Sequence, residues 1–268
     1  MRSPLLAAAF TLLAATAHAA APACEADATA KPARITARVI LVGETHGTEQ
    51  APAFVARLVC GLLAQGRPVT LALERSTSEQ PALDRYLASA GSGEDQRALL
   101  ATGDWAADHQ DGRSSAAMLG LVEQLRRLRQ AGQPVAVMAM VPPAENGSQA
   151  EFDRLMAEQV GATLARQPTP TVVVYAGTFH TAVASRMHQD IVGAPSVGDL
   201  LVAQQPVHVI GLRSGAGEAW NCTQTCGVHA LIAAPWDLPD ARLDTVIELG
   251  PVTASGPARA QVQAQAPR

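Results

Sequence analysis

Six short runs of consecutive apolar residues recur along the chain, separated by segments with helical periodicity. The runs are RVILVG (38–43), VTLALE (69–74), VAVMAM (135–140), TVVVYAG (171–177), VHVIGL (207–212) and TVIEL (245–249). Strands that are apolar without alternation are buried on both faces, which is typical of parallel sheets covered by helices. The order of elements therefore predicts an α/β fold with a mainly parallel central sheet flanked by helices.

The segments between these runs predict the helices and one insertion. Amphipathic stretches cover residues 51–64 and 149–166, and a further helix follows His180. A mostly helical region extends to residue 131, but its part from 78 to 113 has weaker patterns and polar loops. We expect this part to form a helical and loop insertion over the C-terminal edge of the strands.

The first 20 residues have the features of a secretory signal peptide. Arg2 precedes an apolar run over residues 4–15, and small residues at 17 and 19 match a cleavage site. We expect cleavage after Ala19 or Ala20 and a periplasmic or secreted protein. No later apolar stretch is long enough for a membrane span, so no transmembrane segment is expected after cleavage.

The rest of the chain predicts one domain and a tail. Residues 21–250 hold all the predicted strands and helices, so we expect a single α/β domain. Residues 251–268 show no apolar periodicity and predict a disordered tail.

Four cysteines in a chain with an export signal predict two disulfides. The expected pairs are Cys222 with Cys226, which closes a small loop, and Cys24 with Cys60, which fixes the mature N-terminus. The alternative is that Cys222, Cys226 and His229 bind a metal. It is less favoured, because the spacing fits no usual zinc pattern and a fourth ligand is missing.

Composition and missing motifs exclude several classes of function. The chain of 268 residues has a net charge of -4 and contains three Trp, two Tyr and four Phe. It therefore offers no basic surface or stacking platform for nucleic acid. The sequence has no G-x-S-x-G, no G-x-G-x-x-G after the first strand and no P-loop, which disfavours serine hydrolase, dinucleotide and nucleoside triphosphate chemistry.

Polar residues follow three of the predicted strands. Glu44 and His46 come after the first, Glu74 and Arg75 end the second, and His180 follows the fourth. Ligands of open parallel sheets bind outside the carboxyl ends of the strands. The sequence therefore predicts a site at this edge.

Each of these residues also has a purely structural interpretation. Glu44 could lie in the first turn of a helix, where acidic residues are favoured. Glu74 could form a structural ion pair with Arg75 or Arg113. His180 could be a hydrogen-bonded structural histidine, but GTFH repeats the arrangement of GETH, which favours a shared site.

Arg113 and its neighbours lie in the polar segment DHQDGRSS. Its guanidinium could bind a substrate carboxylate or stabilise an oxyanion, or it could pair with Asp108 or Asp111 on the surface. His109 is expected to be a solvent-exposed loop residue, and Trp105 is expected to anchor the insertion.

GETH (43–46), LALE (71–74) and GTFH (177–180), in this order on an α/β pattern, resemble the erythromycin esterase / ChaN-like / Tiki superfamily. The chain looks closest to the exported bacterial ChaN-like branch. The resemblance implies a shared site formed by Glu44, His46, Glu74 and His180, with Arg113 as a further member.

The resemblance also implies the function. We expect an exported hydrolase, metal-assisted, that cleaves an ester, lactone or amide of a small molecule or peptide. Glu44, His46 and His180 would hold a divalent metal, which lowers the pKa of a bound water. Without metal, Glu74 or His46 would be the general base, with His180 and Arg113 stabilising the oxyanion. The alternative is a haem- or iron-binding protein without turnover, with the histidines as haem ligands.

Overall fold

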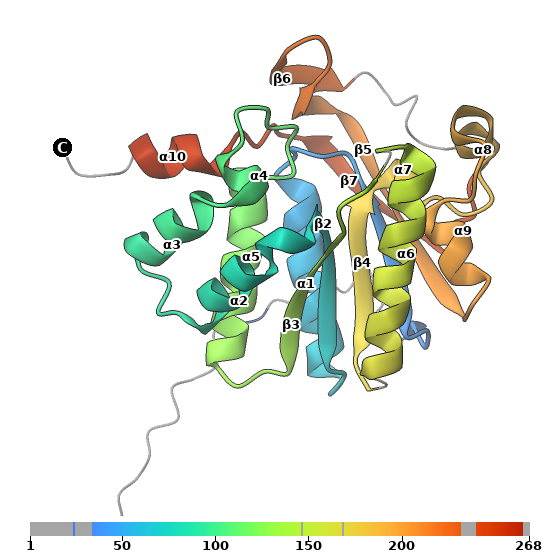
Figure 1. Cartoon of the computed structure of the whole chain (residues 1–268), viewed down its shortest axis with the longest axis horizontal. Coiled ribbons are helices and arrows are strands. Elements are labelled where there is room, and N and C mark those ends of the chain that lie inside the picture. Colours follow the sequence, from blue (N-terminus) through green and yellow to red (C-terminus); the bar gives the residue numbers. More distant parts are fainter. Residues whose placement is uncertain (1–23, 25–33, 146, 168, 232–239, 265–268) are drawn as a thin grey trace, which may run out of the picture.

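A central sheet organises the computed structural model, which describes residues 24, 34–145, 147–167, 169–231 and 240–264 (Figure 1). The seven-stranded sheet has the order β3-β2-β4-β1-β5-β6, and β7 also pairs with β5. All pairs are parallel except β5 with β6, so the predicted α/β class with a mainly parallel sheet is confirmed. The strands are β1 (Val39–Glu44), β2 (Val69–Ser76), β3 (Val135–Val141), β4 (Thr171–Gly177), β5 (Val207–Cys222), β6 (Cys226–Leu231) and β7 (Thr245–Val252).

Helices connect the strands and cover both faces of the sheet. They are α1 (Gln50–Ala64), α2 (Gln80–Ala88), α3 (Gly93–Leu100), α4 (Gly103–Ala106), α5 (Ala116–Gln130), α6 (Gln149–Arg166), α7 (Thr178–Thr181), α8 (Arg186–Val192), α9 (Val197–Val202) and α10 (Ala258–Ala264). The 3-10 turn η2 (Thr77–Glu79) precedes α2. No helix in the described residues is long and apolar enough to cross a membrane.

Successive residues of each central strand supply two different cores. In β1, Ile40 and Val42 belong to the core that also contains residues of α1, α2 and α5. Val39 and Leu41 belong to the opposite core, beneath α6 and α9. Because side chains alternate across a strand and both faces are covered, the strand must be apolar at every position.

Local signals set the ends of the longest helices. The Ser148 and Ser115 side chains accept hydrogen bonds from backbone N–H groups in the first turns of α6 and α5. Gly66 and Gly132, with φ of 71° and 78°, follow the ends of α1 and α5 in a conformation that glycine adopts without steric cost.

The structure corrects two expectations. Strand β6 was not predicted, and β5 extends to Cys222, so the two form a hairpin beyond the parallel sheet. The prediction of a disordered tail is wrong over residues 251–264. Ala254 bridges Thr48, Pro257 bridges Ser115, and the fully buried Ala258 begins α10.

Both expected disulfides, Cys24–Cys60 and Cys222–Cys226, are present. The predicted signal peptide, residues 1–20, lies outside the described residues. Export therefore stays a prediction, as does the extent of the mature domain.

A buried ion pair joins the insertion to the end of β2. Arg75 Nε donates to Glu79 Oε2 over 2.7 Å, and the guanidinium lies 4.0 Å from the ring centroid of Trp105. Arg75, Glu79 and Trp105 are all at most 1% exposed. Trp105 therefore anchors the insertion, as the sequence predicts.

Replacing Arg75 by methionine should lower the free energy of unfolding by about 3–5 kcal/mol, because Glu79 would stay buried without its cation. Chemical denaturation of the two proteins measures the difference. Arg154→Ala is the control, since Arg154 forms an exposed ion pair with Glu158 on α6 and should change the stability little. Equal losses in both variants would contradict the role given to Arg75.

Candidate functional site

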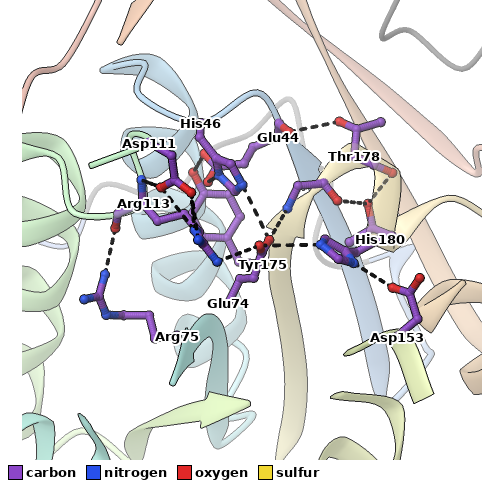
Figure 2. Close-up of polar contacts among 12 residues, drawn as sticks. Glu44, His46, Glu74, Arg75, Asp111, Arg113, Asp153, Tyr175, Thr178 and His180 are labelled. Atoms are coloured by element: carbon purple, nitrogen blue, oxygen red, sulfur yellow. Dashed lines mark hydrogen bonds and ion pairs between the residues drawn. The ribbon is translucent and has the colours of Figure 1, made fainter. Parts of the chain in front are cut away.

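The carboxylate of Glu74, 8% exposed at the end of β2, is the centre of a polar cluster (Figure 2). Its Oε2 accepts a 2.8 Å hydrogen bond from the backbone N–H of Gly177 and lies 3.5 Å from His46 Nε2. Its Oε1 lies 3.5 Å from His180 Nε2 and accepts a 3.2 Å hydrogen bond from Arg113 Nη1. One buried carboxylate thus contacts three cationic side chains.

Parallel strand pairing brings these residues together. In β1 and β4, Glu44 lies beside Gly177, and in β2 and β4, Leu73 lies beside Tyr175. The carboxyl ends of β1, β2 and β4 therefore meet at one edge of the sheet, from which GETH, LALE and GTFH project. This is the edge that the sequence predicts for the site.

Glu44 fixes the orientation of His46. The Glu44 carboxylate accepts a hydrogen bond from Tyr175 Oη and lies 2.9 Å from His46 Nδ1. The imidazole is 22% exposed, whereas Glu44 is 3% exposed. Nδ1 of His46 is therefore committed to Glu44, and Nε2 is directed towards Glu74.

A second carboxylate orients His180. Asp153 on α6 is fully buried, and its Oδ1 lies 2.6 Å from His180 Nδ1. Its Oδ2 lies 3.1 Å from Nε2 of the buried His188. His188 Nδ1 has no hydrogen-bond partner among the described residues, so a proton there would be buried without an acceptor. We therefore place the His188 proton on Nε2, from which it is donated to Asp153.

The segment from His109 to Arg113 closes the site from the side of the insertion. Arg113 also pairs with Asp111, at 2.7 Å from Nη2 to Oδ2. Arg75 Nη1 donates to the Arg113 carbonyl oxygen over 2.9 Å (Figure 2). The predicted ion pair of Arg113 with Asp111 is therefore present, and Arg113 also reaches Glu74. Its role towards a substrate stays a prediction.

Two glycines let this segment approach the GETH loop. A Cβ atom on Gly112 would lie 2.6 Å from the Gly47 nitrogen and 2.5 Å from the Trp220 carbonyl oxygen. Both glycines have positive φ, 98° for Gly112 and 74° for Gly47. The backbones thus pack without side chains between them, which places Arg113 within reach of Glu74.

The proximity of opposite charges shifts the pKa values of the cluster. Burial opposes the charged form of His46, but the Glu74 and Glu44 carboxylates outweigh it and raise the His46 pKa to about 10. Burial likewise opposes protonation of His180, but Glu74 and Asp153 raise its pKa to about 9. Burial disfavours ionised Glu74, whereas His46 and His180 hold its pKa well below 4.5. At neutral pH the cluster is therefore a carboxylate between two imidazolium groups.

The cluster forms part of the wall of a cavity of about 400 Å³. Its lining includes Glu44, His46, Asp111 and His180, together with polar residues of the β5–β6 hairpin. A smaller cavity of about 310 Å³ shares Asp111, Gln149 and His180 with it and adds apolar walls from Val141, Phe152 and Met156. A ligand in these cavities would contact the histidines directly.

The geometry of this cluster does not suit the predicted metal. A metal site needs several ligand atoms close together. In the described residues, one group of three or more His, Cys, Asp or Glu side chains has its ligand atoms within 4.8 Å of one another, and that group does not include Glu44, His46 or His180. The Nε2 atoms of both histidines are directed towards Glu74, and Nδ1 of each contacts another carboxylate. The same contacts occupy the nitrogens that haem would need. The metal and haem assignments therefore stay predictions, and no step below depends on them.

The structure brings together all five predicted site residues, Glu44, His46, Glu74, His180 and Arg113, but their functional roles remain predictions. Sequence reasoning missed Tyr175 and Asp153. Tyr175 is the one hydroxyl-bearing residue between Val172 and Gly177 of an apolar strand, which is a usable signal. Asp153 lies in an ordinary amphipathic helix, so its burial has no signature in a single sequence.

No protein-family model matches the chain, and no curated protein matches it. Solved structures do match its fold. A Bacillus cereus protein superposes with a TM-score of 0.60 at 12% identity, covering 81% of this chain and 89% of its own. A mutant of erythromycin esterase EreC in its open conformation gives 0.54 at 10% identity, with 72% and 75% covered. A succinoglycan biosynthesis protein gives 0.55 at 9% identity, with 83% and 85% covered.

These likenesses show that the chain shares its fold with erythromycin esterase EreC and the two other solved structures. At such low identity they show the fold alone. Membership of the erythromycin esterase / ChaN-like / Tiki superfamily, and the branch within it, stay predictions.

The pKa shifts predict how stability depends on pH. The folded pKa values of His46 and His180 lie above 6.5, so their contribution is present below pH 6.5 and is lost as pH rises through about 9 and 10. The lowered pKa of Glu74 contributes above pH 4.5 and is lost as pH falls towards its folded value. Glu74→Gln removes the largest attraction on both histidines. The free energy of unfolding should therefore fall less between pH 7 and 10 in this variant than in the unmodified protein.

Chemical denaturation at several pH values measures this difference. Glu158→Gln is the matched control, because Glu158 is 59% exposed and pairs with the exposed Arg154 on α6. An alkaline loss of stability that is the same in all three proteins would show that Glu74 does not hold the two histidines protonated.

Proposed function

We propose that the protein is a hydrolase that uses water to cleave an ester, lactone or amide. The observation that carries this proposal is the contact of one buried carboxylate, Glu74, with His46, His180 and Arg113, which line the two cavities described above. Hydrolysis of such a substrate needs a base for water and donors for the developing oxyanion. The fold shared with an erythromycin esterase supports the same class of reaction.

Glu74 is the base in this proposal, because both histidines are protonated at neutral pH. In the free protein its basicity is low, since His46, His180 and Arg113 stabilise the carboxylate. A substrate carbonyl oxygen that becomes negative attracts His180 and Arg113 away from Glu74. The carboxylate then loses the contacts that lower its pKa, and its basicity rises as the oxyanion develops.

The long contacts of the histidines fit this exchange. His180 and His46 lie 3.5 Å from Glu74, beyond an ordinary hydrogen bond, so no short hydrogen bond has to break when their donors turn to a substrate. Asp153 holds Nδ1 of His180 while Nε2 is redirected. Asp153 is therefore a positioning residue for the oxyanion donor.

His46 is the acid for the leaving group. Glu44 and Tyr175 fix its ring, and Nε2 carries the transferable proton. Water forms a bond to the carbonyl carbon and gives a proton to Glu74. The bond from that carbon to the leaving oxygen or nitrogen then breaks, and the leaving atom takes a proton from His46. Proton transfer from Glu74 to His46 across their 3.5 Å contact restores the starting state.

Glu74→Gln should reduce kcat/KM by about 10²–10⁴-fold, because glutamine cannot accept the proton of water. A series of p-nitrophenyl esters, lactones and p-nitroanilides is the substrate panel, and circular dichroism checks the fold. Glu158→Gln, on the exposed side of α6, is the control and should retain full activity. Equal activity of both variants would remove Glu74 from the reaction.

The dependence of activity on pH distinguishes the two bases suggested by the sequence. With Glu74 as base and the histidines as donors, kcat should fall as pH rises through about 9, where His180 loses its proton. With His46 as base, kcat would instead rise towards pH 10. Asp153→Asn removes one attraction on His180 and should move the alkaline limb to lower pH, which a purely structural role of Asp153 would not do.

A further inference from the structure

Three potential metal ligands meet at the tip of the β5–β6 hairpin, outside the Glu74 cluster: two cysteines of the hairpin and His109 from the insertion. The sulfur atoms of Cys222 and Cys226 and a ring nitrogen of His109 lie within 4.8 Å of one another. The shortest distance to the histidine is 3.5 Å, from Cys226 Sγ to His109 Nδ1. This is the one such group of His, Cys, Asp and Glu side chains in the described residues, and the function proposed above does not use it.

Hydrogen bonds of Gln110, the next residue in the chain, hold His109 opposite the hairpin. Trp220 Nε1 donates to the Gln110 carbonyl oxygen over 2.9 Å, and the Gln110 side chain donates to the Trp105 carbonyl oxygen over 2.8 Å. Cys222 Sγ lies 3.3 Å from the same Gln110 carbonyl oxygen. The segment that carries His109 is therefore fixed against β5 independently of any ligand.

We propose that Cys222, Cys226 and His109 bind a zinc ion once the Cys222–Cys226 disulfide is reduced. A dithiol reductant supplies two electrons and two protons, which break the S–S bond, and is itself oxidised to a disulfide. The two thiols lose their protons on binding Zn²⁺, and a neutral His109 supplies a nitrogen lone pair. The three ligands leave the fourth tetrahedral position for water or a substrate group.

The spacing suits a tetrahedral ion. Zn–S and Zn–N bonds of about 2.3 and 2.0 Å place neighbouring ligand atoms about 3.5 Å apart. Cys226 Sγ and His109 Nδ1 already have this separation. Once the S–S bond is broken, the sulfur atoms are free to move apart by side-chain rotation.

The Cys222–Cys226 disulfide is accessible to a reductant. Residues Thr223, Gln224 and Thr225 of the hairpin tip are exposed, and both sulfur-bearing residues are partly exposed. Cys222 also lines the cavity that contains His46 and His180. A metal at the tip would therefore lie beside the entrance to the proposed active site.

Zinc binding by the full chain tests the proposal without any substrate, so its result is independent of the proposed hydrolysis. The protein is treated with a dithiol, desalted under nitrogen, incubated with Zn²⁺ and desalted again, and its zinc content is measured. We expect one equivalent in the reduced protein and none in the oxidised protein. Co²⁺ in place of Zn²⁺ should give thiolate charge-transfer absorption in the near ultraviolet.

Three variants assign the ligands. His109→Ala should weaken zinc binding by at least about tenfold, since second-shell changes alone reach that size and His109 is a direct ligand. His229→Ala is the matched control on β6, where the ring contacts the Thr225 carbonyl oxygen, and should retain zinc. The double variant Cys222→Ser/Cys226→Ser keeps the other disulfide and should bind none.

Retention of zinc in the double variant would overturn the proposal. Zinc that is lost in His229→Ala but kept in His109→Ala would also overturn it. Binding by the oxidised protein that disappears in His46→Ala would place the metal at the Glu74 cluster instead.

Discussion

Glu74 is a carboxylate that follows the apolar residues 71–73 of β2, and it is 8% exposed to solvent. A charge in that position is costly unless other groups replace its hydration. Here one backbone N–H, two imidazoles and a guanidinium surround it. These groups come from three segments, which are the GETH loop, the GTFH segment and the segment that carries Arg113. Together with β2, the requirement of one side chain therefore fixes the relative positions of four parts of the chain.

Close packing of three backbone segments brings the partners of Glu74 into place. The GETH loop, the segment that carries Arg113 and the C-terminal segment meet at Gly47. Gly47 accepts hydrogen bonds from Trp220 N and Ser255 N, and Gly112 packs against it. This explains why the residues after β7 are ordered, because they complete the hydrogen bonding of the loop that presents Glu44 and His46.

The sequence predicts the parts of this arrangement that depend on strand order. Apolar runs that end in polar residues identify the strands, and parallel pairing then brings Glu44, His46, Glu74 and His180 to one edge. The sequence does not predict which side chain lies at the centre of the polar cluster. The choice of Arg113 over Arg75 as the partner of Glu74 depends on Glu79, which binds Arg75, and on the glycine contact that brings in Arg113. The burial of Asp153 depends on how α6 packs, for which a single sequence holds no signal.

The segment from His109 to Arg113 links the two chemistries proposed for this protein. Arg113 at one end contacts Glu74, and His109 at the other end contacts Cys226. Gln110 between them is held by Trp220 and lies against Cys222. A ligand that binds His109 and both sulfur atoms restrains this segment at one end, while the charge of Glu74 restrains it at the other. In the proposed hydrolysis Arg113 turns from Glu74 to the oxyanion by movement of its side chain, because Gln110 holds the backbone of this segment against β5.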